Sequence, residues 1–340
     1  MILSRILLFP YWMTLKIRHW LYDSGRWKSE AFLTQIISVG NVTVGGTGKT
    51  PMVEYLVRAL GRGHKIAVLS RGYKGSNKGF RIVETTDSAL VVGDEPLQIK
   101  RKYPKITVAI DRDRADGVKS LQLLPDAPDI IIMDDGFQRR DIIPGKNIVL
   151  MDYNRPVFKD ELLPLGRLRD LPEQVRRADA VVFTKCPGYL DEEERAAACK
   201  AARINGNQKA FFAGIGYGRP VAVFKGTGNN RYIYAQEAMV FCGVANPKPM
   251  LDYLGKSYRI TGRWFFADHH KFSRAEVEEL SDYALKHPLS VIITTEKDAQ
   301  RLLDNPYVSR ELKVRLFYLP IATEFLTEED KKAFTKYLKS

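Results

Sequence analysis

The chain has 340 residues, of which 45% are hydrophobic, with 53 Lys and Arg against 40 Asp and Glu. This length and composition are typical of a folded protein with two domains and exclude a disordered chain. The net charge of +13 favours anionic partners such as phosphorylated substrates, acidic membranes or nucleic acid, without choosing among them. Cys186, Cys199 and Cys242 form no Cys-x-x-Cys pair. Neither a zinc site nor a disulfide framework is therefore indicated, and a reducing cytoplasm is the expected compartment.

Residues 1–28 combine aromatic and aliphatic side chains with five basic residues and a single acid. Arg5 and Pro10 interrupt the apolar stretch, so the segment lacks the roughly 18 continuous apolar residues of a membrane-spanning helix. Basic residues interleaved with Trp12, Trp20 and Trp27 predict an amphipathic helix lying in a membrane interface. A helix packed on the protein's own core would have a similar pattern, and the two roles are compatible.

Between residues 29 and 219, short β-branched runs alternate with helical stretches. This alternation predicts a doubly wound, mostly parallel α/β sheet with helices on both faces. The expected strands are Ile36–Val39, Ile66–Leu69, Ile106–Ile110, Ile130–Met133, Ile148–Met151 and Ala180–Phe183, and the expected helices are Pro51–Leu60, Glu95–Lys102, Arg114–Leu124 and Asp191–Arg203.

Residues 220–236 are predicted to form two short strands around a Gly/Asn turn, and so to link the first domain to a smaller α/β domain over 237–340. In that second domain we expect strands at 239–242, 291–293 and 316–319. Ser273 and Glu276 have the spacing of a capping box that opens a helix ending near His287.

The segment GNVTVGGTGKTP, residues 40–51, lies between a predicted strand and a predicted helix, which is the setting of a phosphate-binding loop. Its glycines let backbone N–H groups turn toward phosphate oxygens, and the helix start adds a favourable dipole. Lys49 would reach the β- and γ-phosphates, and the Thr50 hydroxyl would ligate Mg²⁺. The general motif has a glycine where this chain has Thr43, and we expect Gly40 to help the chain turn instead. The predicted nucleotide-binding residues are Thr43, Val44, Gly45, Gly46, Thr47, Gly48, Lys49 and Thr50.

Such a loop needs a partner strand that ends in an acid and holds Mg²⁺ directly or through water. The run PDIIIMDDGFQ, residues 128–138, ends an apolar strand in Asp134 and Asp135. A strand ending in a surface turn would look alike, but two adjacent carboxylates followed by Gly136 favour a metal site.

For two further groups of residues, the sequence pattern is compatible with more than one role. Asp94 and Glu95 directly precede a predicted helix, where carboxylates often serve only as caps. A kinase, however, needs a carboxylate to accept the proton of the attacking hydroxyl, and the residues alone support both roles equally. His269 and His270 lie in a predicted loop, where a histidine can tune a neighbouring carboxylate. No zinc-ligand spacing accompanies them.

Motifs in one fixed order along the chain together resemble the tetraacyldisaccharide 4'-kinase family of the lipid A pathway in Gram-negative bacteria. They are VGNVTVGGTGKTP (39–51), SRGYKG (70–75), GDEP (93–96), DDGFQ (134–138), LPLGRLRD (163–170), DHH (268–270) and TEKD (295–298). Thr43 belongs to the family's own form of the phosphate loop. Two positions differ from the family's usual pattern: Asp170, where Glu is common, and the basic pair Arg139–Arg140 after the DDGFQ motif.

The resemblance implies a P-loop fold and a kinase that transfers the γ-phosphate of ATP to the 4'-hydroxyl of an acylated glucosamine disaccharide 1-phosphate. It also implies Mg²⁺ and action at an anionic membrane surface, the cytoplasmic face of the bacterial inner membrane. The implied phosphate contact is Lys49, and the metal site falls on Thr50, Asp134 and Asp135. Asp94 matches the family's proposed catalytic carboxylate, assisted by His269. The further residues expected to line the active site are Arg71, Tyr73, Glu95, Gln138 and Arg169.

Three other classes of protein fit less well. A membrane-associated ATPase switch has a lysine where this chain has Val44. A GTPase needs an acid to pair with guanine where Cys186 and Pro187 follow the strand-Thr-Lys run. Nucleic-acid binding is suggested by charge alone, without a recognisable motif. The oligomeric state is not indicated.

Overall fold

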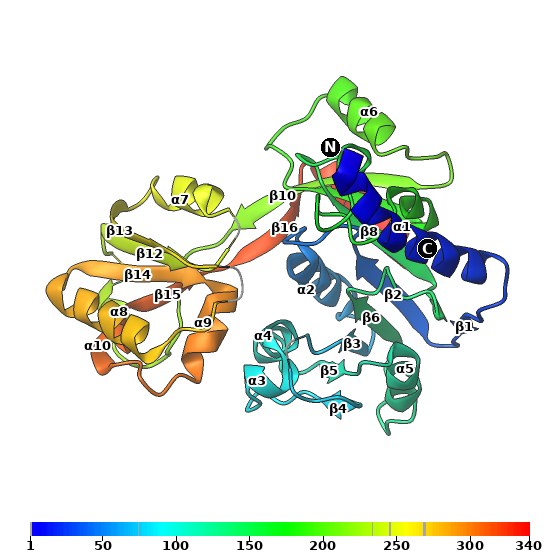
Figure 1. Ribbon diagram of the computed structural model, residues 1–340. Helices are drawn as coiled ribbons and strands as arrows, with labels where there is room; N and C mark the ends of the chain where they lie inside the picture. Colours follow the sequence, from blue (N-terminus) through cyan, green and yellow to red (C-terminus); the bar gives the residue numbers. More distant parts are fainter. Residues whose placement is uncertain (1, 74, 233, 245, 268–269) are drawn as a thin grey trace.

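The computed structural model describes residues 2–73, 75–232, 234–244, 246–267 and 270–340. The chain forms two α/β domains joined by a narrow connection (Figure 1). Within these described ranges, no helix is both long and apolar enough to cross a membrane.

The first domain is built on a mostly parallel sheet with the strand order β16-β10-β9-β8-β2-β6-β3-β5-β4. The edge pairs, β16 with β10 and β4 with β5, are antiparallel. β1 and β7 form a separate parallel pair. The strands are β1 (Glu30–Ala31), β2 (Gln35–Gly40), β3 (Ile66–Ser70), β4 (Arg81–Ile82), β5 (Thr107–Ile110), β6 (Ile130–Asp134), β7 (Ile142–Ile143), β8 (Lys146–Asp152), β9 (Ala180–Thr184), β10 (Lys209–Tyr217) and β16 (Ile321–Phe325).

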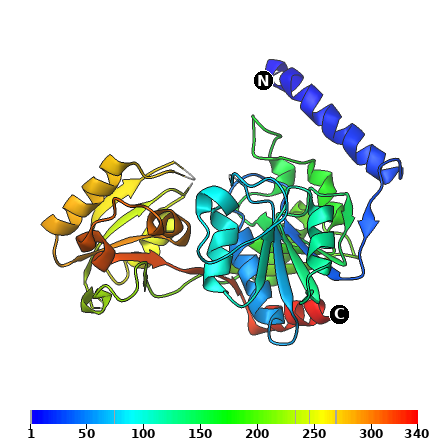
Figure 2. The ribbon, with the colours of Figure 1, turned by 90° about the horizontal axis from the view of Figure 1, so that it is seen from below.

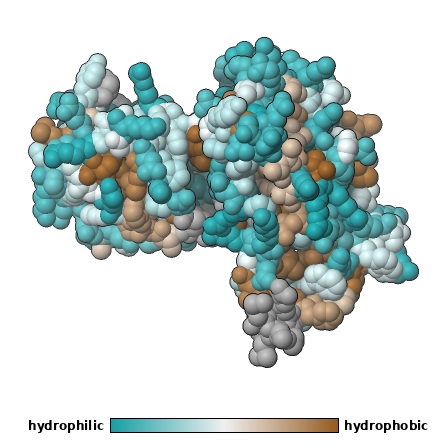
Figure 3. Space-filling view, turned by 90° about the horizontal axis from the view of Figure 1, so that it is seen from above, coloured by the Kyte–Doolittle hydropathy of each residue, from teal (hydrophilic) through white to brown (hydrophobic). Residues whose placement is uncertain are grey.

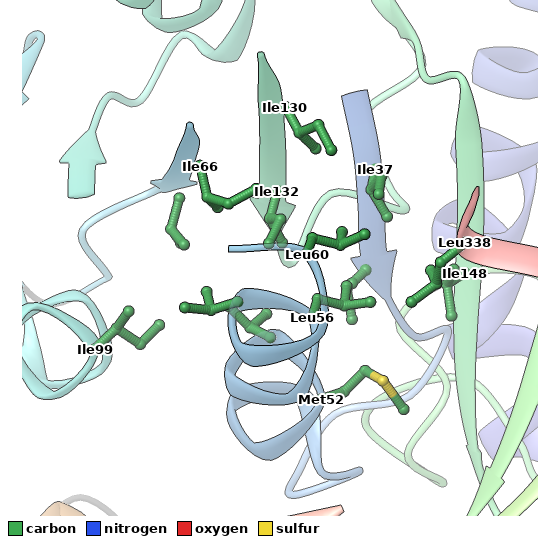
Figure 4. Close-up of a cluster of buried hydrophobic side chains, with 14 of the residues drawn as sticks. Ile37, Met52, Leu56, Leu60, Ile66, Ile99, Ile130, Ile132, Ile148 and Leu338 are labelled. Carbon is green, nitrogen blue, oxygen red and sulfur yellow. The ribbon is translucent and has the colours of Figure 1, made fainter. Parts of the chain in front are cut away.

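Helices cover both faces of this sheet because successive side chains along each strand point to opposite sides. On one face, Ile37 and Ile132 pack with Met52 and Leu56 of α2 and with Leu338 of α11 (Figure 4). The opposite face packs against α5, α1 and α6. This arrangement confirms the predicted doubly wound fold. The helices are α1 (Ile2–Asp23), α2 (Lys49–Leu60), α3 (Ala89–Val92), α4 (Asp94–Lys102), α5 (Arg114–Gln122), α6 (Glu192–Ala201) and α11 (Glu328–Lys339), with 3-10 turns at Val157–Lys159 and Pro172–Arg177.

The second domain has a smaller sheet with the order β11-β15-β14-β12-β13, which is parallel except for the β11–β15 pair. The predicted capping box is confirmed, because Ser273 and Glu276 each accept a hydrogen bond from the other's backbone N–H at the start of α8. The strands are β11 (Val221–Ala222), β12 (Glu237–Cys242), β13 (Arg259–Phe265), β14 (Ser290–Thr295) and β15 (Leu316–Leu319), and the helices are α7 (Lys248–Leu254), α8 (Arg274–Lys286), α9 (Glu296–Leu303) and α10 (Arg310–Arg315), with a 3-10 turn at Asn229–Tyr232.

The linker prediction for residues 220–236 was wrong. The described residues of this segment, 220–232 and 234–236, do not form a hairpin, because β11 pairs with β15 at the edge of the second sheet. Asn229 then donates its side-chain amide to the carbonyl oxygens of Lys313 and Val314 at 3.1 and 3.0 Å. The two-stranded connection is instead made by β10 and β16, which pair from Ala213 to Tyr217. These are the strands that cross between the domains in Figure 1.

The assignment of the whole of 237–340 to the second domain was also wrong at its end. After β15 the chain returns through β16 to the first domain, where α11 lies beneath the sheet (Figure 2). Phe334 and Leu338 are buried in the same core as α2, and the rings of Phe325 and Phe334 lie 4.8 Å apart. The apolar face of α11 therefore completes the first domain's core rather than that of the second.

Helix α1 packs on the first domain along one face and exposes the other. Tyr11, Leu15 and His19, spaced at four residues, lie on the packed face. Trp12 and Trp20 lie on the other face and are 38% and 50% exposed. Figure 3 shows hydrophobic side chains gathered on the part of the first domain that carries α1. The packing role predicted from the sequence is confirmed.

Candidate active site

The phosphate loop joins the end of β2 to α2, as predicted. Gly45 and Gly48 have φ angles of 99° and 84°, in the left-handed region that glycine tolerates best. Gly48 directly precedes α2, so Lys49 and Thr50 are the first residues of that helix. The Lys49 ammonium lies 3.8 Å from Oδ1 of Asp135. Lys49 therefore places the start of α2 next to the acidic motif that follows β6.

The first half of the loop is held in an extended conformation by the LPLGRLRD segment. The Val44 N–H donates to the carbonyl of Arg167 at 2.7 Å, and the Arg169 N–H donates to Val42 at 2.9 Å. Thr43 pairs with Leu168 between them. This antiparallel pairing needs no glycine, which explains why a threonine replaces the glycine of the general motif.

Gly40 has a different role from the one expected. It is the last residue of β2, and a Cβ atom on it would lie 2.6 Å from Cβ of Phe137. A side chain there would push the strand away from the turn that carries the acidic motif. Gly40 therefore serves the close approach of two backbones rather than the turn of the chain.

Asn41 connects the phosphate loop to the acidic motif. Its side-chain amide donates to Oγ1 of Thr47 at 2.6 Å, and its Oδ1 accepts a hydrogen bond from Arg169. Its backbone carbonyl accepts a hydrogen bond from the side-chain amide of Gln138. Asn41 is completely buried, so these bonds are shielded from water. Asn41 was not predicted as a site residue, although it lies inside the GNVTVGGTGKTP motif.

Asp134 ends β6 as a fully buried carboxylate. Burial, together with the charges of Glu95 and Asp135, raises its pKa to about 7. Its Oδ2 accepts a hydrogen bond from the hydroxyl of Ser70 at 3.3 Å. Its Oδ1 is buried and has no hydrogen-bond partner in the part of the chain that the structure describes.

Asp135 is held by cations. Burial alone would raise the pKa of Asp135, but the hydrogen bonds from Arg169 and the charge of Lys49 outweigh burial and lower it. The Arg169 guanidinium donates hydrogen bonds to both carboxylate oxygens, with Nη1 lying 2.8 Å from Oδ2. Asp135 has a φ of 54°, an uncommon conformation that turns the chain directly after the strand.

The chemistry of Asp134 fits a magnesium ion. A buried carboxylate with an unpaired oxygen and a raised pKa is stabilised in its charged form by a cation. Asp134, Asp135 and Thr50 would supply hard oxygen ligands, and Mg²⁺ takes its remaining ligands from water and nucleotide phosphates. Arg114, buried behind the site, donates to the backbone carbonyl of Asp134 at 3.0 Å. Its role was not predicted.

Asp94 and Glu95 begin α4 and face the second domain. Arg301 of α9 donates to Oδ2 of Asp94 from Nε at 3.0 Å, and Lys297 lies 2.7 Å from Oε1 of Glu95. Burial would raise the pKa of Glu95, but the charges of Lys297 and Lys49 outweigh it and lower the pKa. Lys297 belongs to the TEKD motif, whereas Arg301 lies just beyond it and was not predicted.

The remaining predicted residues have fewer contacts with the phosphate loop and the acids. Arg71 and Tyr73 follow β3, and the charge of Arg71 acts on Arg114 behind the acids. Tyr73 is 61% exposed. His269 lies outside the described residues. His270 packs its ring on Phe266 at 4.7 Å and lies 2.9 Å from Oε1 of Glu276, the capping-box acid.

Comparisons with known proteins agree with this geometry. The family model described as Tetraacyldisaccharide-1-P 4'-kinase matches residues 2–340. The tetraacyldisaccharide 4'-kinase of Parabacteroides distasonis is 37% identical over 333 residues, covering 95% of this chain and 90% of the relative. That of Flavobacterium johnsoniae is 37% identical over 333 residues, covering 96% and 94%. The crystal structure of LpxK from Aquifex aeolicus in complex with ATP is similar to this chain, with a TM-score of 0.72 and 27% identity over 99% of both chains.

The family model matches nearly the whole chain, including α1, both domains and the returning α11. The phosphate loop, the acids after β6 and the LPLGRLRD segment meet at one site, as expected for a P-loop kinase. This chain therefore belongs to the tetraacyldisaccharide 4'-kinase family, the ATP-dependent kinases of lipid A biosynthesis.

Proposed function

We propose that this kinase phosphorylates the 4'-hydroxyl of a tetraacylated glucosamine disaccharide 1-phosphate, with Asp94 accepting or orienting the proton of that hydroxyl. The loop amides and Lys49 would hold the β- and γ-phosphates of ATP. Thr50, Asp134 and Asp135 would hold Mg²⁺, which when bound neutralises phosphate charge. Arg169 would share the charge that develops during transfer.

The observation that carries this proposal is the convergence of α4 on the phosphate loop and the acids. Glu95 feels the charges of both Lys49 and Asp135, and Glu95 in turn acts on Asp134. Asp94 precedes Glu95 as the first residue of α4, and we propose that its carboxylate faces the same cluster. Phosphoryl transfer depends mainly on positioning and charge stabilisation, and such a cluster supplies both.

Replacing Asp94 by asparagine is expected to lower kcat about 100-fold, because the attacking hydroxyl loses its proton acceptor. The dissociation constant for Mg-ATP should change by less than about threefold, since Asp94 is outside the phosphate loop. Transfer of label from ATP to the lipid in detergent micelles measures kcat. Asp304→Asn is the matched control and should resemble the wild type, because Asp304 follows α9 and pairs with Arg101 of α4 at 3.0 Å, without a contact to Asp94. Wild-type turnover by Asp94→Asn would contradict the role of Asp94, and ATP hydrolysis stimulated by nucleic acid without lipid transfer would contradict the kinase itself.

The residues around this cluster are proposed to bind the sugar phosphate. Arg71 and Tyr73 reach the surface beside the acids, where a phosphate and a sugar ring could approach. Gln138 donates its side-chain amide to the carbonyl of Asn41. It would therefore act by holding the phosphate loop in shape. His269 is proposed to assist Asp94.

We further propose that the exposed face of α1 lies on an anionic membrane surface, the cytoplasmic face of the inner membrane. Trp12 and Trp20 expose large apolar surfaces on this face. Lys16 lies over the Trp12 ring at 5.5 Å, and Arg26 lies over the Trp20 ring at 4.3 Å. Aromatic rings beside basic groups suit the boundary between anionic headgroups and acyl chains.

Membrane binding can be tested by changing that face alone. Trp12→Glu with Trp20→Glu should reduce co-sedimentation with vesicles rich in anionic phospholipid about tenfold or more, since buried apolar area is lost and negative charge is added. Leu285→Glu, at a 58% exposed leucine of the second domain, is the matched control and should bind like the wild type. Unchanged binding of the double variant would leave α1 with its packing role alone.

A further inference from the structure

The two domains meet where α4 and α9 lie side by side (Figures 1 and 2). The contact is made largely by charged side chains, each pair joining one helix to the other. The ion pairs are Lys102 with Glu296 at 3.0 Å, Arg101 with Asp304 at 3.0 Å, Lys297 with Glu95 at 2.7 Å, and Arg301 with Asp94.

Arg301 is the most enclosed of the basic residues in this contact. Its side chain is 9% exposed, and Nη1 lies 2.8 Å from Oδ1 of Asp298. Asp298 is itself completely buried and accepts hydrogen bonds from the Gly243 N–H at 2.9 Å and from the hydroxyl of Thr295 at 2.7 Å. Arg301 is therefore anchored to the core of the second domain while it reaches Asp94 in the first. An anchored guanidinium fixes its partner carboxylate in direction as well as distance.

One of these pairs extends the contact to a third helix. Lys102 of α4 lies 2.7 Å from Oε2 of Glu54 on α2 and 3.0 Å from Glu296 at the start of α9. Glu54 is one helical turn beyond Thr50, so the network connects α9 to the helix that begins at the phosphate loop. Because Glu54 and Glu296 are buried, separating either one from Lys102 would leave a charge without a partner. The cost of that separation keeps the three helices in one arrangement.

We infer that Arg301 and Lys297 are positioning residues for phosphoryl transfer, holding the carboxylates of Asp94 and Glu95 against the phosphate loop from the second domain. The inference rests on the proposed role of Asp94. A carboxylate on the first turn of a helix has several rotamers, each of which points it in a different direction. The bond from Arg301 selects one of them. The second domain therefore contributes to the reaction by orienting groups of the first.

The test compares two arginines of the same contact. Arg301→Gln should lower kcat about 10- to 100-fold, because a displaced carboxylate no longer meets the hydroxyl, while the KM for ATP stays within about threefold of the wild type. Arg301→Lys, which keeps a cation, should recover part of the loss. Arg101→Gln breaks the pair with Asp304 at the same contact without touching Asp94 and should leave kcat unchanged.

The outcomes separate this inference from the proposed function. Wild-type kcat for Arg301→Gln, or an equal loss for Arg101→Gln, overturns the positioning role. If Asp94→Asn is inactive while Arg301→Gln is fully active, only the positioning role fails. If Asp94→Asn is itself fully active, the proposed function of Asp94 fails. In the double variant Asp94→Asn/Arg301→Gln, kcat should fall no further than in Asp94→Asn, because the two residues act as a unit. Circular dichroism reports folding, and Lys297→Gln, expected to lower kcat without changing the KM for ATP, replaces Arg301→Gln if the latter does not fold.

Discussion

Replacing Lys49 by methionine should lower kcat about 1,000-fold. Lys49 is the first residue of α2, and its ammonium lies 3.8 Å from Asp135 at the end of β6. Its charge therefore sits between the loop that would hold the phosphates and the acids that would hold the metal. Removal of a single preorganised group that stabilises developing charge typically lowers kcat by about 100- to 1,000-fold. Methionine keeps the length and volume of the side chain, so the loss reports the charge rather than a cavity.

The kcat of the Lys49→Met variant can be measured by lipid phosphorylation at saturating Mg-ATP, with ATP affinity from calorimetry. Lys331→Met is the matched control, because Lys331 lies on α11 and pairs with Glu328 at 3.2 Å, away from the site. The control should have wild-type kcat. A Lys49→Met enzyme that keeps a tenth or more of wild-type kcat would contradict the assignment of Lys49 to the phosphates.

Replacing Asp170 by alanine should lower the free energy of unfolding of the first domain by about 3–5 kcal/mol. Asp170 is completely buried, and its Oδ1 lies 2.6 Å from Nε2 of His19 on α1. Arg177 lies 3.9 Å from Oδ2. Burial would raise the pKa of Asp170, but the hydrogen bond and charge of His19 outweigh it and lower the pKa. Without the carboxylate, Nε2 of the buried His19 loses its hydrogen-bond partner and Arg177 loses the nearby negative charge, which is the costly case.

Urea unfolding followed by tryptophan fluorescence measures this loss, since Trp12, Trp20 and Trp27 all lie in or beside α1. Asp126→Ala is the control. Its pair with Lys65 is exposed, and exposed pairs contribute about 1 kcal/mol or less. If Asp170→Ala and Asp126→Ala unfold at the same urea concentration, Asp170 does not hold α1 to the domain.

The sequence predicted elements well where a local pattern determines the outcome. The strand, glycine loop and helix around Lys49 follow from periodicity and glycine placement over a dozen residues. The capping box at Ser273 is equally local. Such features depend on neighbours along the chain, and they were confirmed.

Contacts between distant segments were not predictable in the same way. His19 and Asp170 are 151 positions apart, and Arg301 and Asp94 are 207 apart. Nothing in the sequence near Asp170 distinguishes a buried ion pair from a surface acid. Asp170 and Arg140, which come from two other segments of the chain, both contact His19. These contacts hold α1 to the first domain.

The domain to which α11 belongs was likewise not predictable from the sequence. The apolar face of α11 at Phe334 and Leu338 is readable from periodicity, but periodicity does not say which of two cores it completes. The error in the second domain's boundary follows from this ambiguity. A pairing between β10 and β16, more than a hundred residues apart, decides the matter.

The return of the chain through β16 affects the order in which the protein is made. The ends of the second domain meet where the Gly218 N–H donates to the carbonyl of Pro320 at 2.9 Å, so that domain is an insertion within the first. During synthesis, residues 221–319 leave the ribosome before β16 and α11. The inserted domain can therefore close while the sheet around the phosphate loop still lacks its edge strand and α11. The nucleotide site, although its loop is encoded near the start of the chain, belongs to the part of the protein that is completed last.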